Sequence, residues 1–346
     1  MNIKQSTLAA AVTAALAMGA SGQAAANVYG LSSLSIDKLT IAIAPTSGTG
    51  FAANITNFDF TVTNTATLNG ASSPVQTATC GGTPGAGNND CGTAPVLDAL
   101  AANAPAGASR VNNDLSQGDG STLARLGPGA LQYATADSVI VTAELVNLGS
   151  PTSTHQIAES ELQAGGTASS NAEIQSQTGF TISFTTAGNF SLDLDFLADV
   201  DMLALVNETT AGNNAQANMT ASFTLSNDNT GESIGWSPQG TSANDCSVTG
   251  FISATCAEAA DTEDLNRNVG QSTNGSTGNS YDGAVPAAGF GAYGIDVRNL
   301  GAGSWTLTLN TVTSTRLRQV PEPGMLALLG IGLMGMGMSA RRKKLA

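Results

Sequence analysis

Regular alternation of apolar and polar residues dominates the middle of the chain. The clearest example begins at Phe190, where Phe190, Leu192 and Leu194 alternate with serine and aspartate. Similar runs occur at 58–68, 180–185, 222–226 and 305–310, and further candidate strands lie at 39–43, 139–148 and 293–297. A period of two is typical of antiparallel strands that bury one face and expose the other.

Turn residues separate these runs. Asn69-Gly70 follows one run, and the residues at 186–189 predict a hairpin between two others. Only 95–103 has the spacing of a short helix. About ten successive strands predict an all-β fold, an antiparallel β-sandwich of the jelly-roll kind. Two stretches with few apolar residues, near 70–129 and 272–283, are expected to be long loops.

The N-terminus has the features of a secretory signal peptide. Lys4 is the only charge in the first 36 residues, and an apolar run from Leu8 to Ala17 follows it. Small residues then lead to an A-x-A site at Ala24 and Ala26. The run is too short for a stable membrane anchor. We therefore expect a signal helix at 1–26, export through the Sec translocon, and cleavage by signal peptidase after Ala26.

The C-terminus combines two prolines, an apolar stretch and a basic end. The prolines belong to the segment Val320, Pro321, Glu322, Pro323 and Gly324. The apolar stretch at 325–340 would form a helix of roughly 24 Å, short of a hydrocarbon core of about 30 Å. The chain then carries the basic cluster Arg341, Arg342, Lys343 and Lys344. Basic residues favour the cytoplasmic side, and the prolines keep Glu322 in an extended segment.

This order of features resembles the PEP-type C-terminal sorting signal of exosortase substrates. The resemblance covers 320–346 and leaves 27–319 for the sandwich domain. It implies a short transmembrane helix that inserts transiently in the inner membrane of a Gram-negative bacterium. It also implies that exosortase, a membrane-embedded cysteine transpeptidase, removes the tail near Pro323. The product would reach the cell surface or extracellular matrix, where exopolysaccharide is the expected partner.

The charge of the chain restricts its partners. The net charge is −14, from 12 basic and 26 acidic residues. The two terminal signals contain five of the basic residues and only Glu322 of the acidic ones. The body is therefore even more acidic than the whole chain. A surface of this sign repels nucleic acid, so no nucleic-acid partner is expected.

Four cysteines lie in the exported part of the chain. They allow three disulfide connectivities. Pairing of Cys80 with Cys91 and of Cys246 with Cys256 is expected, because each bond closes a short local loop in an oxidising compartment. The chain has no C-x-x-C and a single histidine, so no metal site is expected from cysteine and histidine ligands.

Candidate catalytic residues are few. His155 has Glu159 four residues later but no second histidine, and a solvated loop or strand is expected there. The pairs Asp193/Asp195 and Asp199/Asp201 have the spacing to bind calcium or to serve as acid and base in glycoside hydrolysis. The apolar residues between them favour the exposed face of a half-buried sheet instead. No nucleophile motif or dinucleotide site occurs, so no catalytic residue and no cofactor is predicted.

The sequence therefore predicts an exported, exosortase-processed surface or extracellular-matrix protein without catalytic activity. One alternative is a carbohydrate- or calcium-binding module. A further alternative is a polysaccharide-active enzyme that uses two carboxylates.

Overall fold

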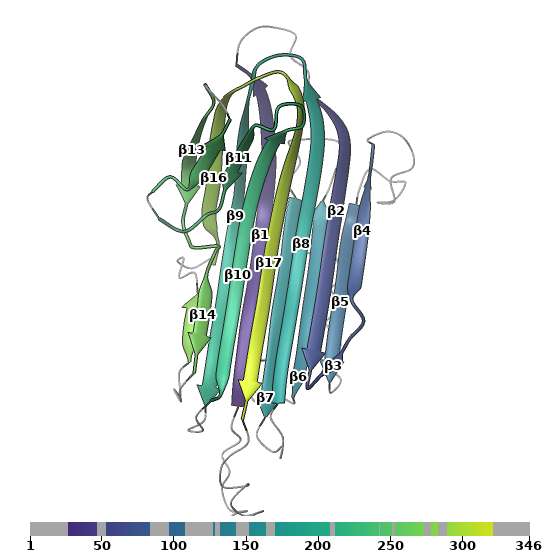
Figure 1. Ribbon diagram of the computed structural model, residues 1–346, viewed down its shortest axis with the longest axis vertical. Coiled ribbons are helices and arrows are strands. Elements are labelled where there is room, and N and C mark those ends of the chain that lie inside the picture. Colours follow the sequence, from purple (N-terminus) through teal and green to yellow (C-terminus); the bar gives the residue numbers. More distant parts are fainter. Residues whose placement is uncertain are drawn as a thin grey trace, which may run out of the picture.

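The structure is a computed structural model in which two antiparallel sheets pack face to face (Figure 1). It describes residues 27–46, 53–83, 97–107, 127–128, 132–142, 152–163, 170–207, 212–241, 243–250, 253–272, 278–282 and 289–320. These residues form seventeen strands and no helix. The all-β prediction is confirmed, whereas the terminal helices expected at 1–26 and 325–340 lie outside the described residues.

The first sheet, called sheet A, has eight strands. Their order is β13 (Thr255–Asp261), β16 (Gly291–Leu300), β9 (Phe190–Asn207), β1 (Asn27–Pro45), β7 (Thr152–Gln163), β6 (Tyr133–Thr142) and β5 (Leu97–Gly107), with β15 (Asn279–Asp282) also paired to β9. The N-terminal strand β1 is thus central.

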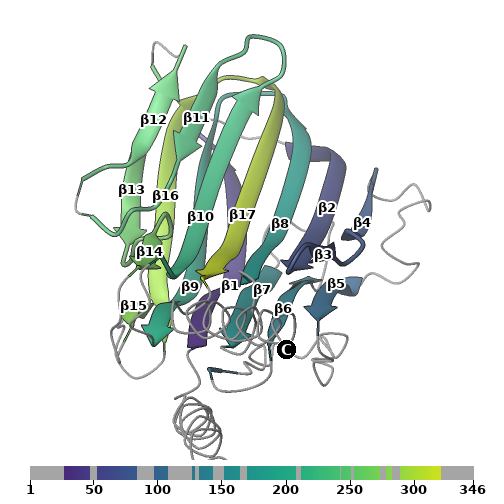
Figure 2. The same cartoon turned by 60° about the horizontal axis from the view of Figure 1, so that its bottom comes forward.

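The second sheet, called sheet B, has nine strands and lies in front of sheet A in Figure 2. Their order is β12 (Cys246–Thr249), β11 (Ser233–Trp236), β10 (Asn214–Asn227), β17 (Gly303–Gln319), β8 (Ser170–Thr186), β2 (Ala53–Leu68) and β3 (Ala71–Ser72), with β14 (Asn268–Gln271) on β10 and β4 (Gln76–Gly82) on β2. The C-terminal strand β17 is central here.

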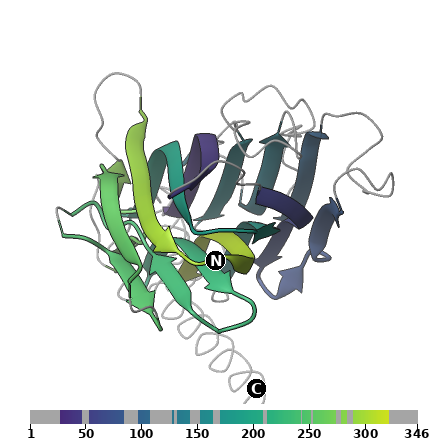
Figure 3. The same ribbon diagram turned by 90° about the horizontal axis from the view of Figure 1, so that it is seen from above.

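Apolar side chains from the facing sides of both sheets form the core. Viewed along the strands, the sheets form two layers with the core between them (Figure 3). The predicted alternation is confirmed at Phe190, Leu192 and Leu194, which are all fully buried. The ring of Phe190 meets that of Trp305 edge to face, with centroids 5.4 Å apart. Such a pair contributes about 0.5–1.5 kcal/mol beyond burial.

A polar network crosses the middle of the core, which the alternation does not predict. The hydroxyls of Thr178 on β8 and Thr311 on β17 lie 2.6 Å apart, within hydrogen-bonding distance, and Oε1 of Gln156 on β7 lies 3.1 Å from the first and 3.3 Å from the second, as an acceptor for the proton that the hydroxyl pair leaves free. Beside them, Ser160 Oγ lies 2.9 Å from Thr315 Oγ1. Buried polar atoms need such partners to offset lost hydration, so these bonds favour one register between the sheets.

Three local expectations were wrong. The helix expected at 95–103 is replaced, from Leu97 onward, by strand β5. The turn at 186–189 does not form a hairpin within one sheet, because β8 belongs to sheet B and β9 to sheet A. The segment 70–129, expected to be a long loop, contains β3, β4 and β5, and the segment 272–283 contains β15. Long-range pairing orders these segments despite their weak apolar pattern.

Candidate functional site

The most informative site is the junction between β17 and the C-terminal tail. Strand β17 ends at Gln319, still paired with Ser170 of β8, while Arg318 pairs with Asn214 of β10. The next residue, Val320, donates its backbone N–H to Oδ1 of Asn213 at 2.7 Å. The first residue of the predicted sorting motif is therefore held against the folded sandwich.

The start of the body lies at the same end of the molecule. Strand β1 begins at Asn27, directly after the predicted signal cleavage site. A Cβ on Gly30 would lie only 3.0 Å from Leu317 Cδ2, which shows how closely the two terminal strands pack. Both strands reach the lower end of the sandwich in Figure 1, so the chain enters and leaves the body there.

Comparison with protein families identifies the segment that begins at this junction. Residues 319–343 match the PEP-CTERM protein-sorting motif. The chain carries a PEP-CTERM sorting signal. The match contains the predicted motif Val320–Gly324 and most of the basic cluster, and it starts at the last residue of β17. It implies an exported protein that is processed by exosortase and directed to the surface or beyond.

No curated protein and no solved structure matches the chain. Residues 321–346 lie outside the described residues, as do Ala24 and Ala26. Within the part that the structure describes, no helix has the length and apolar character needed to cross a membrane.

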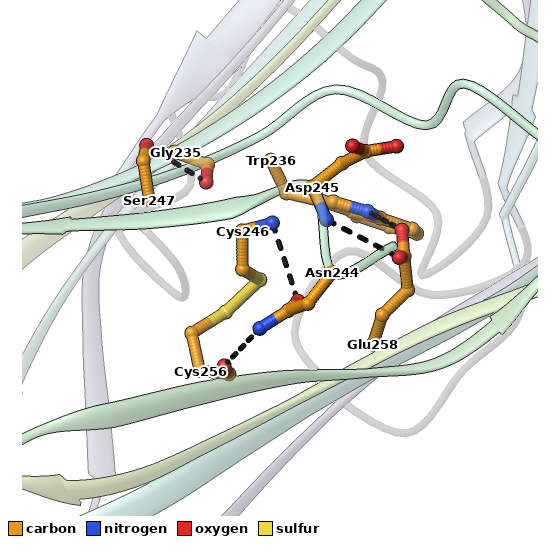
Figure 4. The surroundings of a disulfide bond; sticks show 8 residues. All are labelled: Gly235, Trp236, Asn244, Asp245, Cys246, Ser247, Cys256 and Glu258. Atoms are coloured by element: carbon orange, nitrogen blue, oxygen red, sulfur yellow. Dashed lines mark hydrogen bonds between the residues drawn. A yellow bond between two sulfur atoms is a disulfide. The ribbon is translucent and has the colours of Figure 1, made fainter. Parts of the chain in front are cut away.

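A second site surrounds the disulfide between Cys246 and Cys256, which confirms the predicted pairing. Cys246 lies on β12, at the edge of sheet B, and Cys256 on β13, at the edge of sheet A. The bond therefore joins the two sheets at one edge (Figure 4). Cys80 is buried on β4, but Cys91 lies outside the described residues, so its expected pairing with Cys80 stays a prediction.

Three carboxylates converge beside this disulfide. Asp245, Glu258 and Asp261 each offer an oxygen, and these oxygens lie within 4.8 Å of one another. Glu258 reaches between Trp236 and Asp245, accepting hydrogen bonds from the indole Nε1 and from the backbone N–H of Asp245 (Figure 4). Asp261 Oδ2 accepts from the backbone N–H of Gly240 at 2.7 Å. The hydrogen bonds hold the carboxylates in position.

Two oxygens in this group of three carboxylates lack a hydrogen-bond donor in the part of the chain that the structure describes. Asp245 Oδ2 and Asp261 Oδ1 are buried and have no hydrogen-bond partner among the described residues. Burial raises the pKa of Asp261, and the charge of Glu258 acts in the same direction, against the N–H groups of Gly240 and Gln239. Calcium takes carboxylate oxygens as ligands. Asp245, Glu258 and Asp261 could therefore hold a divalent cation.

Sequence reasoning missed this group because strand pairing, not spacing, assembles it. The only available signal was that Asp245 and Glu258 flank the two cysteines of a short disulfide loop.

The structure places the predicted carboxylate pairs differently. Asp193 and Asp195 lie on β9, where Asp193 forms an ion pair of 3.1 Å with Arg298, which also contacts Asp296 at 3.3 Å. Burial raises the pKa of Asp193, and Arg298 opposes this rise. A carboxylate engaged by arginine is poorly suited to act as a free base. Asp199 and Asp201 follow on the same strand, opposite Ser35 and Ser33.

His155 is on a strand, as one of the expected alternatives had it, but it is not solvated. It lies on β7 with only 3% of its surface exposed, and its Nε2 is 3.6 Å from Asp37 Oδ1. Burial lowers the pKa of His155, while Asp37 acts in the opposite direction. Glu159 accepts from the Tyr29 hydroxyl at 2.8 Å. Four strand residues span about 13 Å, so His155 and Glu159 cannot share a metal ion.

Proposed function

We propose that this chain is a noncatalytic protein of the cell surface or extracellular matrix, delivered through Sec and signal peptidase and trimmed by exosortase. The observation that carries this proposal is the PEP-CTERM match that starts at the last residue of the last strand of the folded body. The pairing of Asp193 with Arg298 and the burial of His155 support a noncatalytic role, because both candidate groups are already engaged in the fold.

We also propose a jelly-roll topology and exopolysaccharide as the partner. Long strands pass repeatedly from one sheet to the other along the chain, as β1 to β2 and β8 to β9 do, which supports the topology. The outer face of sheet B carries hydroxyl pairs such as Ser183/Thr306 and Thr63/Thr77. Hydroxyls of this kind can exchange hydrogen bonds with a polysaccharide without requiring charge.

The test is the intact mass of the protein from the surface fraction of its native host. The expected mass corresponds to a chain that starts at Asn27 and ends near Pro323. A Pro321→Ala, Glu322→Ala variant should retain the tail and accumulate in the inner membrane. If the wild-type protein retains the residues from Met325 onward, exosortase processing and the matrix role built on it are wrong.

Calcium binding is a second candidate function, favoured by the group Asp245, Glu258 and Asp261. Titration of the purified body with calcium chloride should give a saturable heat and a higher unfolding midpoint. The Asp245→Asn, Asp261→Asn variant should lose both effects. The control Asp228→Asn, in the turn that follows β10, should retain them. Absence of heat with the wild type would exclude this function. Binding of glycans through tryptophan is not favoured, because Trp236 and Trp305 are both buried.

A further inference from the structure

The sorting motif begins without a spacer after the folded body. Val320 donates to Asn213, whose side chain is only 1% exposed. The side chain of Val320 also packs over the turn before β10, since a Cβ on Gly212 would lie 3.1 Å from Val320 Cγ2. Gly212 has a φ of 97°, a conformation that favours glycine. The turn is thus shaped to receive Val320.

The strand that precedes Val320 is held on both sides. Arg316 and Arg318 pair with β8 on one side and with β10 on the other. Between them, Leu317 points into the core and is 1% exposed. The end of β17 is therefore an integral part of sheet B and not a loose extension.

This arrangement restricts access to the peptide that must be cut. The three residues that follow Gln319, up to Glu322, extend over roughly 10 Å at most. Neighbouring strands lie about 4.8 Å to either side of β17, and sheet A packs about 10 Å behind it. A transpeptidase that binds extended chain on both sides of its cleavage point would collide with β8 and β10 while the strand end remains paired.

We propose that Asn213 and the end of β17, Arg316–Val320, form a latch that exosortase must open before it can process the tail. This inference rests on the proposed function, because it assumes that exosortase acts on this chain. Strand ends open locally more often than whole sheets unfold. The frequency of opening at this end then sets the rate at which the folded chain is processed.

The experiment follows trimming of the full-length chain by mass over time, in membranes that contain exosortase. Asn213→Ala removes the hydrogen bond to Val320. Insertion of about six Gly/Ser residues between Gln319 and Val320 adds roughly 13 Å of mean reach. A matched control places the same insertion between Asn229 and Thr230, in a turn at the opposite end of β10. We expect the first two variants to be trimmed several-fold faster than wild type, and the control at the wild-type rate.

A second variant fixes the end of β17 to β8 with a disulfide and tests whether trimming becomes slower. Asn171→Cys with Arg318→Cys places two cysteines at register partners on β8 and β17, where a disulfide can hold the strand end in the sheet. Trimming of this variant should be several-fold slower, and the insertion after Gln319 should restore it. Wild type under the same oxidising conditions is the control.

The outcomes separate the latch from the proposed function. If wild type is trimmed and the Pro321→Ala, Glu322→Ala variant is not, but the insertion and the lock leave the rate unchanged, the latch is refuted and the proposed function stands. If wild type itself keeps its tail, the proposed function fails, and the latch fails with it. The insertion does not alter the sandwich, so a folding defect in Asn213→Ala would not hide the result.

Discussion

The Cys246–Cys256 disulfide permits a quantitative test of how the sandwich is stabilised. It closes a loop with a sequence separation of 10 and joins the edge strands of the two sheets. In the chain-entropy model, the disulfide lowers the conformational entropy of the unfolded chain. This stabilises the folded state by about 2.7 kcal/mol at 25 °C. Replacing both cysteines by alanine should therefore lower the free energy of unfolding by about this amount.

The assay is urea unfolding of the mature body, followed by the fluorescence of the two buried tryptophans, Trp236 and Trp305. The double alanine variant should unfold at lower urea, and its melting temperature should drop by about 4 °C, from the average unfolding entropy per residue. Ser247→Ala is the matched control, since the hydroxyl of this exposed neighbour on β12 makes one hydrogen bond within the described part of the chain, to the backbone oxygen of Gly235.

A change of less than about 0.5 kcal/mol, with the wild-type disulfide verified by mass, would refute the reasoning from loop entropy. A loss well beyond 5 kcal/mol would refute it too, because that exceeds the usual range for one disulfide. The variant should also lose calcium-dependent stabilisation, because the disulfide ties β12, which follows Asp245, to β13, which carries Glu258.

Three further predictions concern other parts of the body. Burial lowers the pKa of His155 in the folded state, so the unfolded chain binds a proton first as the pH falls. Stability should be retained above about pH 6.5 and decline below it, and His155→Gln should lack this decline in pH-dependent urea midpoints. Burial raises the pKa of Asp261 in the folded state, so the folded protein holds this proton more tightly than the unfolded chain does. The stability that this provides is lost as the pH rises through the folded-state pKa, because the buried carboxylate then carries a charge. Asp261→Asn avoids this charge and should unfold at higher urea than wild type at pH 7 without calcium. Trp305→Ala removes a fully buried ring packed against Phe190 and should cost about 3–5 kcal/mol, measured by the same unfolding assay, whereas Trp305→Phe should cost less.

The chain's local patterns predicted much of the fold. The alternation at Phe190, Leu192 and Leu194 predicted which side of β9 faces the core, because neighbouring side chains on a strand point to opposite faces. The short spacing of Cys246 and Cys256 predicted their disulfide. The order of residues after Gln319 predicted the sorting signal, since that signal is a linear motif and needs no tertiary context.

Tertiary structure decided the features that depend on pairing between distant residues. Strand β7 has little apolar alternation, yet residues on both of its sides are buried, His155 on one side and Gln156 on the other. Burial of both faces needs another segment over the outer face, such as the one at Gly127, which donates its N–H to Glu159 and which local spacing cannot reveal. The carboxylates of Asp245 and Asp261 meet only because the edges of the two sheets come together. The hydrogen bond from Val320 to Asn213 likewise joins residues 107 positions apart, so only the completed sheet could show that the sorting signal starts on the folded body.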